Sequence, residues 1–542
     1  MHRTLAIPEV VSLVFEEVAS RPPGIPSPAD RPYGAVGLAR LARTCRAFSD
    51  PALNLLWKSQ YTIIPLLRCF PPHLWEITGS GAPDDPKIFR PQSSIMHSDC
   101  ARVLSYSSRI REITLGHDLT GLPKDLPLPV LEVLNVLGVG CLLPNVQHLG
   151  WSPNDPTVFP YITLFLGSAL SSVHLTVLPT LPHLSLLSHL AAKFPTLRKV
   201  SISEPSSTVV NATIVLAVSS LVLAMTNAKE VRVPYLHAEA YLHLASLTSL
   251  EILEVHALWG VSSPKLGAHP HPCFQSLRDL NLRSFTIEGA TGLVTMLSNP
   301  PLKSLYLIVN ASPSASTMQA FFATLADHAS HSHLTHLDVH IGESLDPVSY
   351  SGTLLVLPPL LTFQNLRYVS LELPFGMAID DSWCSSLASP HLEELVLEPR
   401  GSPPSSVRLA ALVAFARDCP VLRELSLPVD ATDTAALTLP LQPRVRQTNL
   451  RRVRFPDSPI RSAPPVARFL SSLFPCIDRF NAFAPEENGS LLWDQVAELL
   501  PVLTDVRAEV EVYWTSRAEA LNSPSRSPHI LRHYVGCQGF SK

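Results

Sequence analysis

The densest collection of side chains that could bind a metal lies between positions 327 and 340. It contains Asp327, His328, His331, His333, His336, Asp338 and His340. Imidazole and carboxylate groups are zinc ligands, but zinc needs three or four of them converging at about 2 Å. Alternate residues of a strand lie roughly 6.5–7 Å apart, which keeps His336, Asp338 and His340 from sharing one ion. We therefore expect no metal site in this segment.

No motif typical of catalysis or nucleotide binding occurs in the chain. It lacks a phosphate-binding loop, a G-x-G-x-x-G turn, a G-x-S-x-G elbow and an H-E-x-x-H helix. The 9 cysteines are scattered and never spaced as C-x-x-C, which is typical of reduced thiols in cytosol or nucleus. We expect no enzyme, no cofactor, and a cytoplasmic or nuclear location.

Charge and hydropathy argue against two classes of partner. The formal net charge is -4, only 16% of residues are charged, and no long run of Lys or Arg occurs. Such a chain offers no electrostatic footprint for nucleic acid or an anionic membrane. The longest apolar run, residues 213–225, falls short of the ~20 residues of a membrane span and predicts a buried helix.

One short pattern, apolar-x-x-apolar-x-apolar, recurs along most of the chain. Strong copies run from Ile110-Ile113-Leu115 through Leu131-Leu134-Val136 to Leu450-Val453-Phe455, and weaker ones extend to Leu503-Val506-Ala508. Beyond position 250 the leading residues are 25 to 32 positions apart. Predicted helices, such as 184–194, 318–328, 409–418 and 466–474, lie between the predicted strands. We predict an α/β chain of strand-helix units.

This period resembles that of leucine-rich repeats. The resemblance implies a solenoid with parallel strands on the concave face and helices on the convex face. The family's Asn or Cys three residues after the last strand apolar is missing, as in Leu282 followed by Arg283-Ser284-Phe285. We therefore expect an irregular solenoid with uneven curvature; an unrelated α/β array is the alternative.

The polar positions of these strands form a candidate surface for a partner. Apolar residues of each strand face the core, so alternate positions lie on the concave face. Acids, imidazoles and two tyrosines gather there, which suits a polar or basic protein segment with aromatic anchors. An ordinary solvated strand face is the alternative for each residue. The candidate target-binding residues are Asp279, Asn281, Arg283, Tyr306, His336, Asp338, His340, Tyr368, Glu372 and Glu394.

The first 60 residues predict three helices. Pro8 and Glu9 suit the start of a helix reaching Val18. A Pro-rich loop follows, then an amphipathic stretch over 36–48. A third helix is predicted from Asp50 to Gln60, with Asp50 as its N-cap and Pro51 in its first turn.

Three motifs in these helices resemble the F-box. Ile7, Pro8 and Val10 match its leading motif, Cys45, Arg46 and Phe48 its central one, and Trp57 its closing one. Ile7 replaces the usual Leu, and the loop over 21–36 is longer than most F-boxes have. The resemblance implies docking on the Skp adaptor of a cullin-type ubiquitin ligase. The implied adaptor-binding residues are Ile7, Pro8, Val10, Val14, Cys45, Phe48 and Trp57.

The sequence thus predicts four segments. They are an F-box-like helical module over 1–62, a linker or first cap over 63–105, a leucine-rich-repeat solenoid over 106–515 and a C-terminal tail over 516–542. The resulting hypothesis is the substrate-recognition subunit of a Skp-cullin-F-box ubiquitin ligase, whose repeats bind an unidentified target protein. The alternative is a repeat scaffold outside any ligase, whose N-terminal helices only cap the first repeat.

Overall fold

The fold was analysed in a computed structural model of the chain. The structure describes residues 8–19, 34–78, 88–91, 93, 95–116, 128–136, 140–152, 156–204, 211–259, 273–309, 313–341, 354–374, 376–399, 406–434 and 445–522. The chain divides into two compact units. Met1–Pro313 and Ala323–Leu334 form the first, and Ser314–Phe322 and Thr335–Lys542 form the second.

The first unit begins with three helices, α1 (Pro8–Ala19), α2 (Ala35–Leu41) and α3 (Arg46–Lys58). The prediction of one helix over 36–48 was wrong, because Cys45 is extended, with φ of -158°, and separates α2 from α3. Asp50 and Pro51 therefore lie inside α3 rather than at its start. Gly34 enters α2 with φ of +74°, and a Cβ there would lie 2.2 Å from the carbonyl oxygen of Val18.

The predicted linker over 63–105 contains regular structure in much of its described part. Within residues 59–116 the strands are β1 (Ser59–Gln60), β2 (Trp75–Thr78), β3 (Ile88–Pro91) and β4 (Glu112–Leu115). The helices are α4 (Ile64–Leu67), η2 (Pro72–Leu74), η3 (His97–Cys100) and α5 (Ala101–Ser107). β2 and β3 form an antiparallel pair, whereas β1 pairs in parallel with β4. Because β1 follows α3 directly, the helical module leads straight into the sheet.

Apart from β2 and β3, the described strands of the first unit form a parallel sheet whose order follows the chain, from β1 and β4 to β11. The further strands are β5 (His148–Trp151), β6 (Ser172–Thr176), β7 (Lys199–Ser203), β8 (Glu230–His237), β9 (Ile252–Trp259), β10 (Asp279–Phe285) and β11 (Ser304–Val309). The helices between them are α6 (Leu128–Val136), η4 (Pro156–Phe165), α7 (Leu181–Lys193), α8 (Ala212–Ala224), α9 (Ala238–Ser246) and α10 (Ile287–Val294). α11 (Ala315–His328) contributes residues to both units.

The second unit repeats this arrangement. Its parallel strands are β12 (His336–Ile341), β14 (Tyr368–Leu373), β16 (Glu394–Pro399), β17 (Glu424–Ser426), β18 (Arg452–Phe455) and β19 (Arg479–Ala482), again in chain order. A short parallel pair, β13 (Leu354–Leu355) and β15 (Gly376–Met377), lies apart from them. Its helices are η6 (Pro358–Thr362), α12 (Asp381–Leu387), η7 (Leu409–Ala411), α13 (Leu412–Asp418), α14 (Ala463–Leu473) and α15 (Glu487–Asn522). The predicted α/β class is confirmed.

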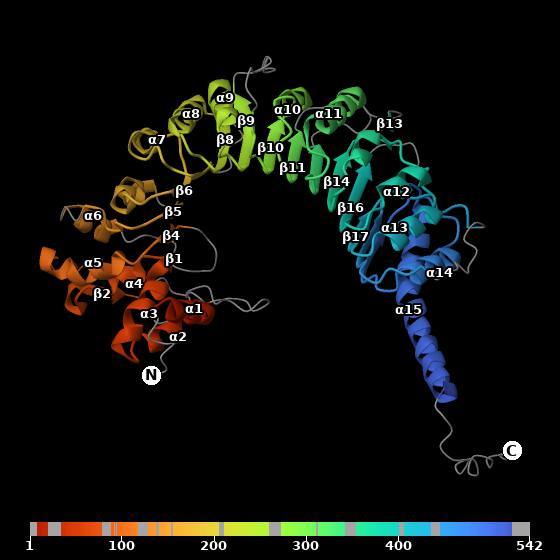
Figure 1. Cartoon of the computed structure of the whole chain (residues 1–542), viewed down its shortest axis with the longest axis horizontal. Helices are drawn as coiled ribbons and strands as arrows, with labels where there is room; N and C mark the ends of the chain where they lie inside the picture. Colours follow the sequence, from red (N-terminus) through yellow and green to blue (C-terminus); the bar gives the residue numbers. More distant parts are fainter. Residues whose placement is uncertain are drawn as a thin grey trace, which may run out of the picture. The chain divides into compact units, whose positions relative to one another are not determined.

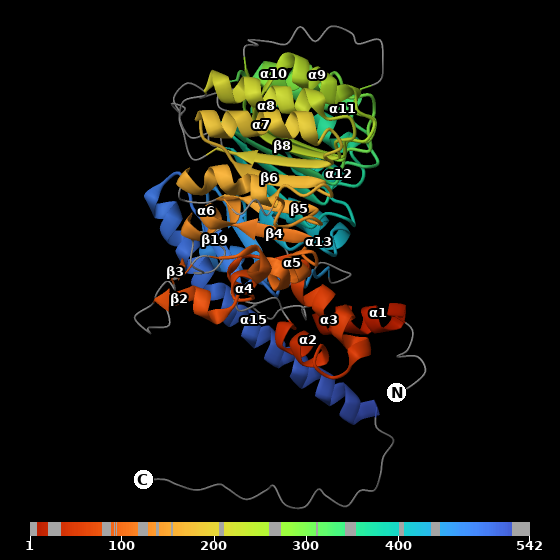
Figure 2. The same cartoon turned by 90° about the vertical axis from the view of Figure 1, so that its left-hand side faces the viewer.

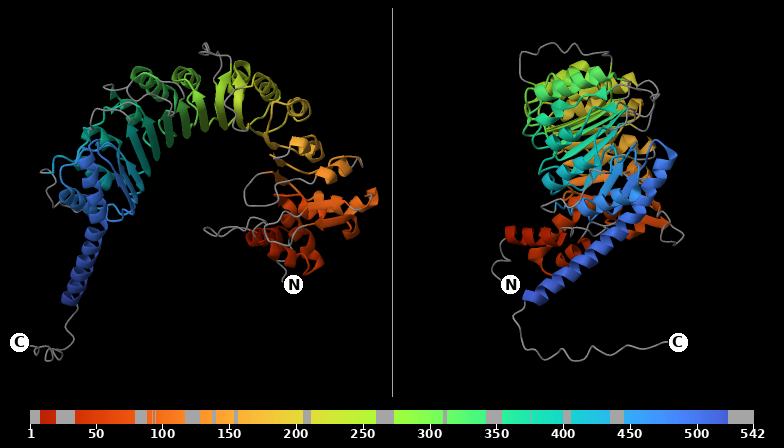
Figure 3. Two further views of the ribbon diagram at one scale, coloured as in Figure 1. Left: turned by 180° about the vertical axis from the view of Figure 1, so that it is seen from behind. Right: turned by 90° about the vertical axis from the view of Figure 1, so that its right-hand side faces the viewer.

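Helices cover one side of the strands in each unit. Figures 1 and 2 show α7 to α10 on one side of the first unit's strands, and the view from behind in Figure 3 shows the strands of the second unit side by side. Alternate strand residues are buried toward the helices, as the pattern of β12, intermediate-buried-intermediate, illustrates. We call the other side of each sheet its open face.

One backbone feature recurs where neighbouring strands begin. The residue just before a strand accepts two hydrogen bonds at its carbonyl oxygen. The donors are the backbone N–H groups of the residue just before the next strand and of that strand's first residue. Lys229, for example, accepts from Glu251 and Ile252 at 2.8 and 3.0 Å. In the second unit the carbonyl oxygen of Thr335 likewise accepts two hydrogen bonds, from the N–H groups of Arg367 and Tyr368 at 2.8 and 3.0 Å. We call this series the shared-carbonyl ladder. It aligns equivalent residues of successive strands.

The apolar run over 213–225 forms α8, as predicted. Asn211 caps the helix, its side-chain oxygen accepting the backbone N–H of Thr213 at 2.9 Å. Ile214, Val218 and Leu221 are fully buried, while Leu216 on another face is 60% exposed. Burial of most of this surface explains why the run is so apolar.

Two copies of the apolar pattern are helical, so their prediction as strands was wrong. Leu131-Leu134-Val136 lies in α6 and Leu503-Val506-Ala508 in α15. Apolar residues three apart fit one helix face as well as the start of this strand pattern. α15 also carries the chain past position 515, where a tail was predicted.

The N-terminal half of α15 packs on the second unit. Trp493 is 1% exposed, lies against Phe455 and Phe480, and donates its indole N–H to the carbonyl oxygen of Ser458 at 2.7 Å. The C-terminal half of α15 extends away from this unit's strands (Figures 1 and 3). Val510, Tyr513 and Trp514 are about half exposed there.

Gln447 makes buried polar contacts between neighbouring repeats of the second unit. Its side chain is buried, donates to the carbonyl oxygens of Cys419 and Leu422, and accepts the N–H groups of Asn449 and Leu450. We expect Gln447→Leu to lower the free energy of unfolding by about 1–3 kcal/mol per group left unpaired, measured by urea denaturation.

The matched control is Gln495→Leu, at an exposed position of α15. An exposed substitution of the same kind should change stability by no more than about 0.5 kcal/mol. Equal unfolding curves for the two variants would contradict the role assigned to Gln447.

Candidate functional site

The helical module has its own small core. Val11, Phe15, Leu38 and Ala52 are buried together. Phe48 is partly buried against them, its ring meeting that of Phe15 edge-on at 5.2 Å between centroids. The central motif residue Phe48 therefore supports the module from inside.

The opposite face of α1 is apolar and exposed. Leu13 is 66% and Val14 45% exposed, and Val10 is partly exposed. Residues three and four apart on a helix are neighbours, so these three side chains form one patch. We call it the α1 patch. Leu13 was missed in the sequence, although its spacing from Val10 could have found it.

The remaining predicted adaptor-binding residues have different positions. Cys45 is exposed at the start of α3. Ile7 lies outside the described residues, and Pro8 is the first residue of α1. Trp57 is only 9% exposed and stacks on Tyr106 of α5, with ring centroids 4.9 Å apart. Trp57 thus holds the module to the sheet-bearing part of the first unit.

A second contact reinforces this junction. Arg109 forms an ion pair with Asp50 at 2.7 Å and also donates to the side chain of Asn54. Asp50, predicted as an N-cap, instead binds an arginine that lies 59 residues away in sequence.

On the open face of the first unit, predicted residues form a polar cluster. Arg283 lies 3.1 Å from Glu254 and stacks on Tyr306, its guanidinium carbon 5.6 Å from the ring centroid. Asn281 lies directly opposite Tyr306 and Glu254 on the two neighbouring strands. The structure therefore brings Asn281, Arg283 and Tyr306 together, while Asp279 lies one pair further along, opposite Ser304.

On the open face of the second unit, predicted residues align in rows across the strands. His336 lies opposite Tyr368, which lies opposite Glu394. The rings of His336 and Tyr368 stack, 4.3 Å apart and 18° from parallel. A flat aromatic surface thus borders the carboxylate of Glu394.

Glu393 orients the tyrosine of this row. The hydroxyl of Tyr368 donates to Glu393 at 2.7 Å, and Arg367 pairs with the other carboxylate oxygen. The hydrogen bond from Tyr368, followed by Arg367, lowers the pKa of Glu393. Glu393 is buried and its position is outside the alternating pattern, so the sequence did not mark it.

His340 lies between two carboxylates. One ring nitrogen contacts Asp338 and the other lies 3.4 Å from Glu372 on the adjacent strand. The hydrogen bond to Asp338 raises the pKa of His340, assisted by both negative charges and opposed by burial. These three side chains form a charge cluster; within the described residues no group of three or more His, Cys, Asp or Glu has the arrangement of a metal site.

Arginines neutralise the far end of the same face. Arg452 lies 3.0 Å from Glu424, and Arg454 lies 3.2 Å from Glu424 and 3.3 Å from Glu398. Among the described residues, Glu394 has no hydrogen bond or ion pair from its side chain. Burial and the neighbouring charge of Glu424 raise its pKa. Glu394 is therefore the carboxylate of this face that an external cation would stabilise most.

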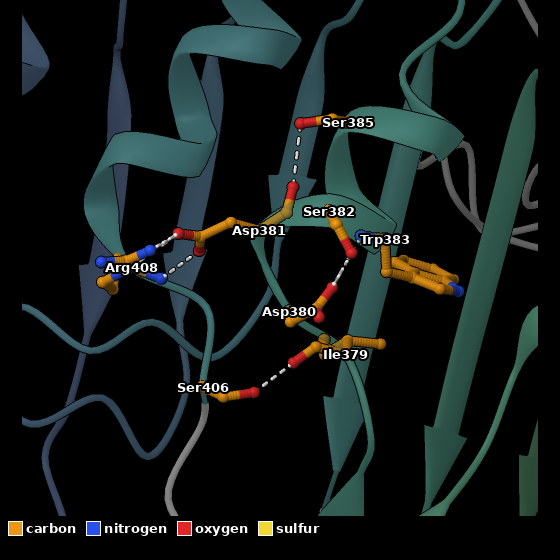
Figure 4. A network of polar contacts seen from close by, with 8 residues as sticks. All are labelled: Ile379, Asp380, Asp381, Ser382, Trp383, Ser385, Ser406 and Arg408. Atoms are coloured by element: carbon orange, nitrogen blue, oxygen red, sulfur yellow. Dashed lines mark hydrogen bonds and ion pairs between the residues drawn. The ribbon is translucent and has the colours of Figure 1, made fainter.

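The helix side of the second unit carries a different polar network, drawn in Figure 4. Asp380 caps α12 by accepting the backbone N–H of Trp383 at 2.8 Å. Asp381 accepts the backbone N–H and the Nε–H of Arg408, both at 2.8 Å. Asp380 thus caps its own helix, and Asp381 ties α12 to the next repeat through Arg408, which identifies the network as structural.

Comparison with known proteins assigns no family to the chain. No family model and no curated protein matches it. In the part of the chain that the structure describes, no helix has the length and apolar character needed to cross a membrane. Its function therefore has to be argued from its own residues.

The cluster around His340 predicts a pH-dependent contribution to stability. Because the folded state raises the pKa of His340, its stabilising charge interactions are complete below the ordinary pKa of about 6.5 and are lost as pH rises through the raised value. We expect Asp338→Asn to bring the pKa of His340 down, measured by histidine NMR titration with His340→Gln to assign the signal.

Glu230→Gln is the control, because Glu230 is an open-face carboxylate that pairs with Lys199 and Arg232 in the first unit. It should leave the titration of His340 unchanged. A signal that titrates at or below pH 6.5 in the unmodified chain and does not respond to Asp338→Asn would contradict the cluster.

Proposed function

We propose that the chain is the substrate-recognition adaptor of a Skp-cullin-F-box ubiquitin ligase, acting in the cytoplasm or nucleus. The helical module docks on the Skp-type adaptor, which links it to the cullin scaffold. The strand-helix units form an irregular leucine-rich-repeat solenoid with its strands on the concave face and its helices on the convex face. Their open faces bind the target protein, and the chain itself performs no catalysis.

The α1 patch is the observation that carries the docking proposal. α1 is apolar on two faces: Val11 and Phe15 are used by the module's core, and Leu13 and Val14 face outward. A contiguous apolar patch on an exposed helix face is typical of a surface that a protein partner covers. The patch follows the leading motif and lies where the F-box resemblance expects an adaptor.

The shared-carbonyl ladder supports the solenoid proposal. In each unit the strands of the main sheet follow the chain order and pair in parallel, and helices cover one side. Stacked repeats bury in this way an apolar side that no single unit could cover alone.

The open face of the second unit indicates the kind of target. Five carboxylates, Asp338, Glu372, Glu394, Glu398 and Glu424, share this face with His340 and with three arginines, Arg452, Arg454 and Arg479, of β18 and β19. This excess of acid beside the His336–Tyr368 stack suits a basic segment, because a lysine or arginine of the target can approach both Glu394 and the aromatic rings.

The alternative, a scaffold outside any ligase, also has a supporting observation. Trp57 and Asp50 join the module to α5 and the following loop, and β1 extends the sheet. These contacts are what a cap would make. The α1 patch, which no described residue covers, is what a cap has no need for.

Substitutions in the α1 patch distinguish the ligase adaptor from the scaffold outside any ligase. We expect Leu13→Asp with Val14→Asp to weaken binding to purified Skp adaptor by about thirtyfold or more, because two apolar interface side chains become charged. Binding is measured by calorimetry with the full chain. The melting temperature should stay the same, since both side chains are exposed.

Leu181→Asp is the matched control. Leu181 is 80% exposed on α7, outside the module, so its substitution should leave adaptor binding unchanged. The ligase proposal fails if the unmodified chain does not bind the adaptor, or if the patch variant binds as tightly as the control.

A further inference from the structure

The ladder places a second set of side chains in one column, at the edge of the first unit's sheet where the strands begin. Each column residue donates its N–H to the carbonyl of the column residue before it, at 2.7–2.8 Å from Arg198 to Lys303. The column residues before β7 to β11 are Arg198, Lys229, Glu251, Arg278 and Lys303. We call the four cations of this set the basic edge.

Side chains in the column reach their neighbours. Lys229 forms an ion pair with Glu251 at 3.1 Å. The hydrogen bond from Lys229 lowers the pKa of Glu251, and Arg278 adds to the effect. Glu251 is the sole acid among the five, so four positive charges face one negative charge along this edge.

Two arginines of the basic edge are not used by the fold. Arg198 and Arg278 are exposed, and neither side chain makes a hydrogen bond or ion pair within the described residues. Elsewhere the same column position serves the fold: Arg111 donates to the carbonyl oxygen of Asn145 at 3.2 Å, and Arg451 to that of Cys476 at 3.3 Å. The contrast separates arginines that bind loops from arginines that offer their guanidinium groups to solvent.

A competing explanation for the exposed cations of the basic edge is that they stabilise the ends of helices. The helices of these repeats end near the edge where strands begin, and cations stabilise helix C-termini by about 0.3–1 kcal/mol. Lys193, in the last turn of α7, serves that purpose. Arg198 and Arg278 donate to none of the described helix-end carbonyls, so helix capping does not account for them.

The spacing of the basic edge fits an extended chain. Neighbouring strands lie about 4.8 Å apart, so three strand steps from Arg198 to Arg278 span roughly 14 Å. An extended peptide rises about 3.3 Å per residue, which puts side chains four residues apart at roughly 13 Å and on the same side. Acidic residues four positions apart would therefore meet Arg198 and Arg278, and a peptide with acids at alternate positions contains such pairs.

We propose that the basic edge, Arg198, Lys229, Arg278 and Lys303, is a second interaction surface that binds an extended acidic segment of a partner protein. It lies on the strand-start edge, away from the alternating residues of the open face. It is independent of adaptor docking, because none of its residues belongs to the helical module.

Fluorescence anisotropy of labelled peptides on the full chain tests this surface. The probes are a twelve-residue peptide alternating Ser and Glu, and a peptide of the same composition with its Glu residues in one block. We expect the alternating peptide to bind more tightly, and Arg198→Glu with Arg278→Glu to weaken it about tenfold or more. Raising salt to about 1 M should abolish binding by screening.

Arg68→Glu with Arg461→Glu is the control of equal charge. Both arginines are exposed and neither belongs to the column, so the variant should bind like the unmodified chain. Arg198→Lys with Arg278→Lys, which keeps the charge, should retain most of the affinity.

Four results would overturn the proposal. The first is that the unmodified chain binds neither peptide, and the second is that the control loses as much affinity as Arg198→Glu with Arg278→Glu. Alternatively, a twelve-nucleotide oligo-dT could bind more tightly than the peptide, which would make the edge a nucleic-acid surface. A drop in melting temperature for the Glu variant with unchanged peptide affinity would assign the arginines to helix ends instead.

Discussion

The organisation of each unit depends on one repeated interaction, the carbonyl oxygen that accepts two N–H groups from the next strand. Where this bond forms, as from Tyr368 to Thr335 and from Glu394 to Arg367, the register of two strands is set. A slip of one residue would exchange the buried and the open face of a strand. The bond therefore decides which side chains lie beside one another, including His336, Tyr368 and Glu394 in one row.

Because equivalent residues of successive strands are aligned, the few charged side chains of the chain gather on the open faces and along the strand-start edge. Only 16% of its residues are charged, yet many of them occupy the open faces and the column before the strands. Most form pairs between neighbouring strands, such as Arg452 with Glu424. Glu394 on the open face, and Arg198 and Arg278 on the edge, make no side-chain hydrogen bond or ion pair among the described residues. We regard such unpaired charges as the groups most available to other proteins.

The sequence predicted the α/β class and most strand positions, because strands with one buried side alternate in polarity with a period of two. It did not separate strand from helix at Leu131-Leu134-Val136, where apolar residues three apart suit both. The start of α3 was predicted at Asp50, because Pro51 is typical of a first helical turn. The helix instead begins at Arg46, directly after the extended Cys45. Alternation predicted that His340, Asp338 and Glu372 share one face, but not that they contact one another. Glu393 and the stacking of Trp57 on Tyr106 were not predicted, because both depend on contacts between distant segments.

The central claim is that the helical module docks on a Skp-type adaptor while the strand faces stay free for a target. Hydrogen exchange of the full chain with and without purified adaptor tests it most directly. The account predicts slower exchange in Pro8–Ala19 and at the start of Arg46–Lys58, with β12 to β18 unchanged. Unaltered exchange in α1, or slowing confined to the strands, would contradict it.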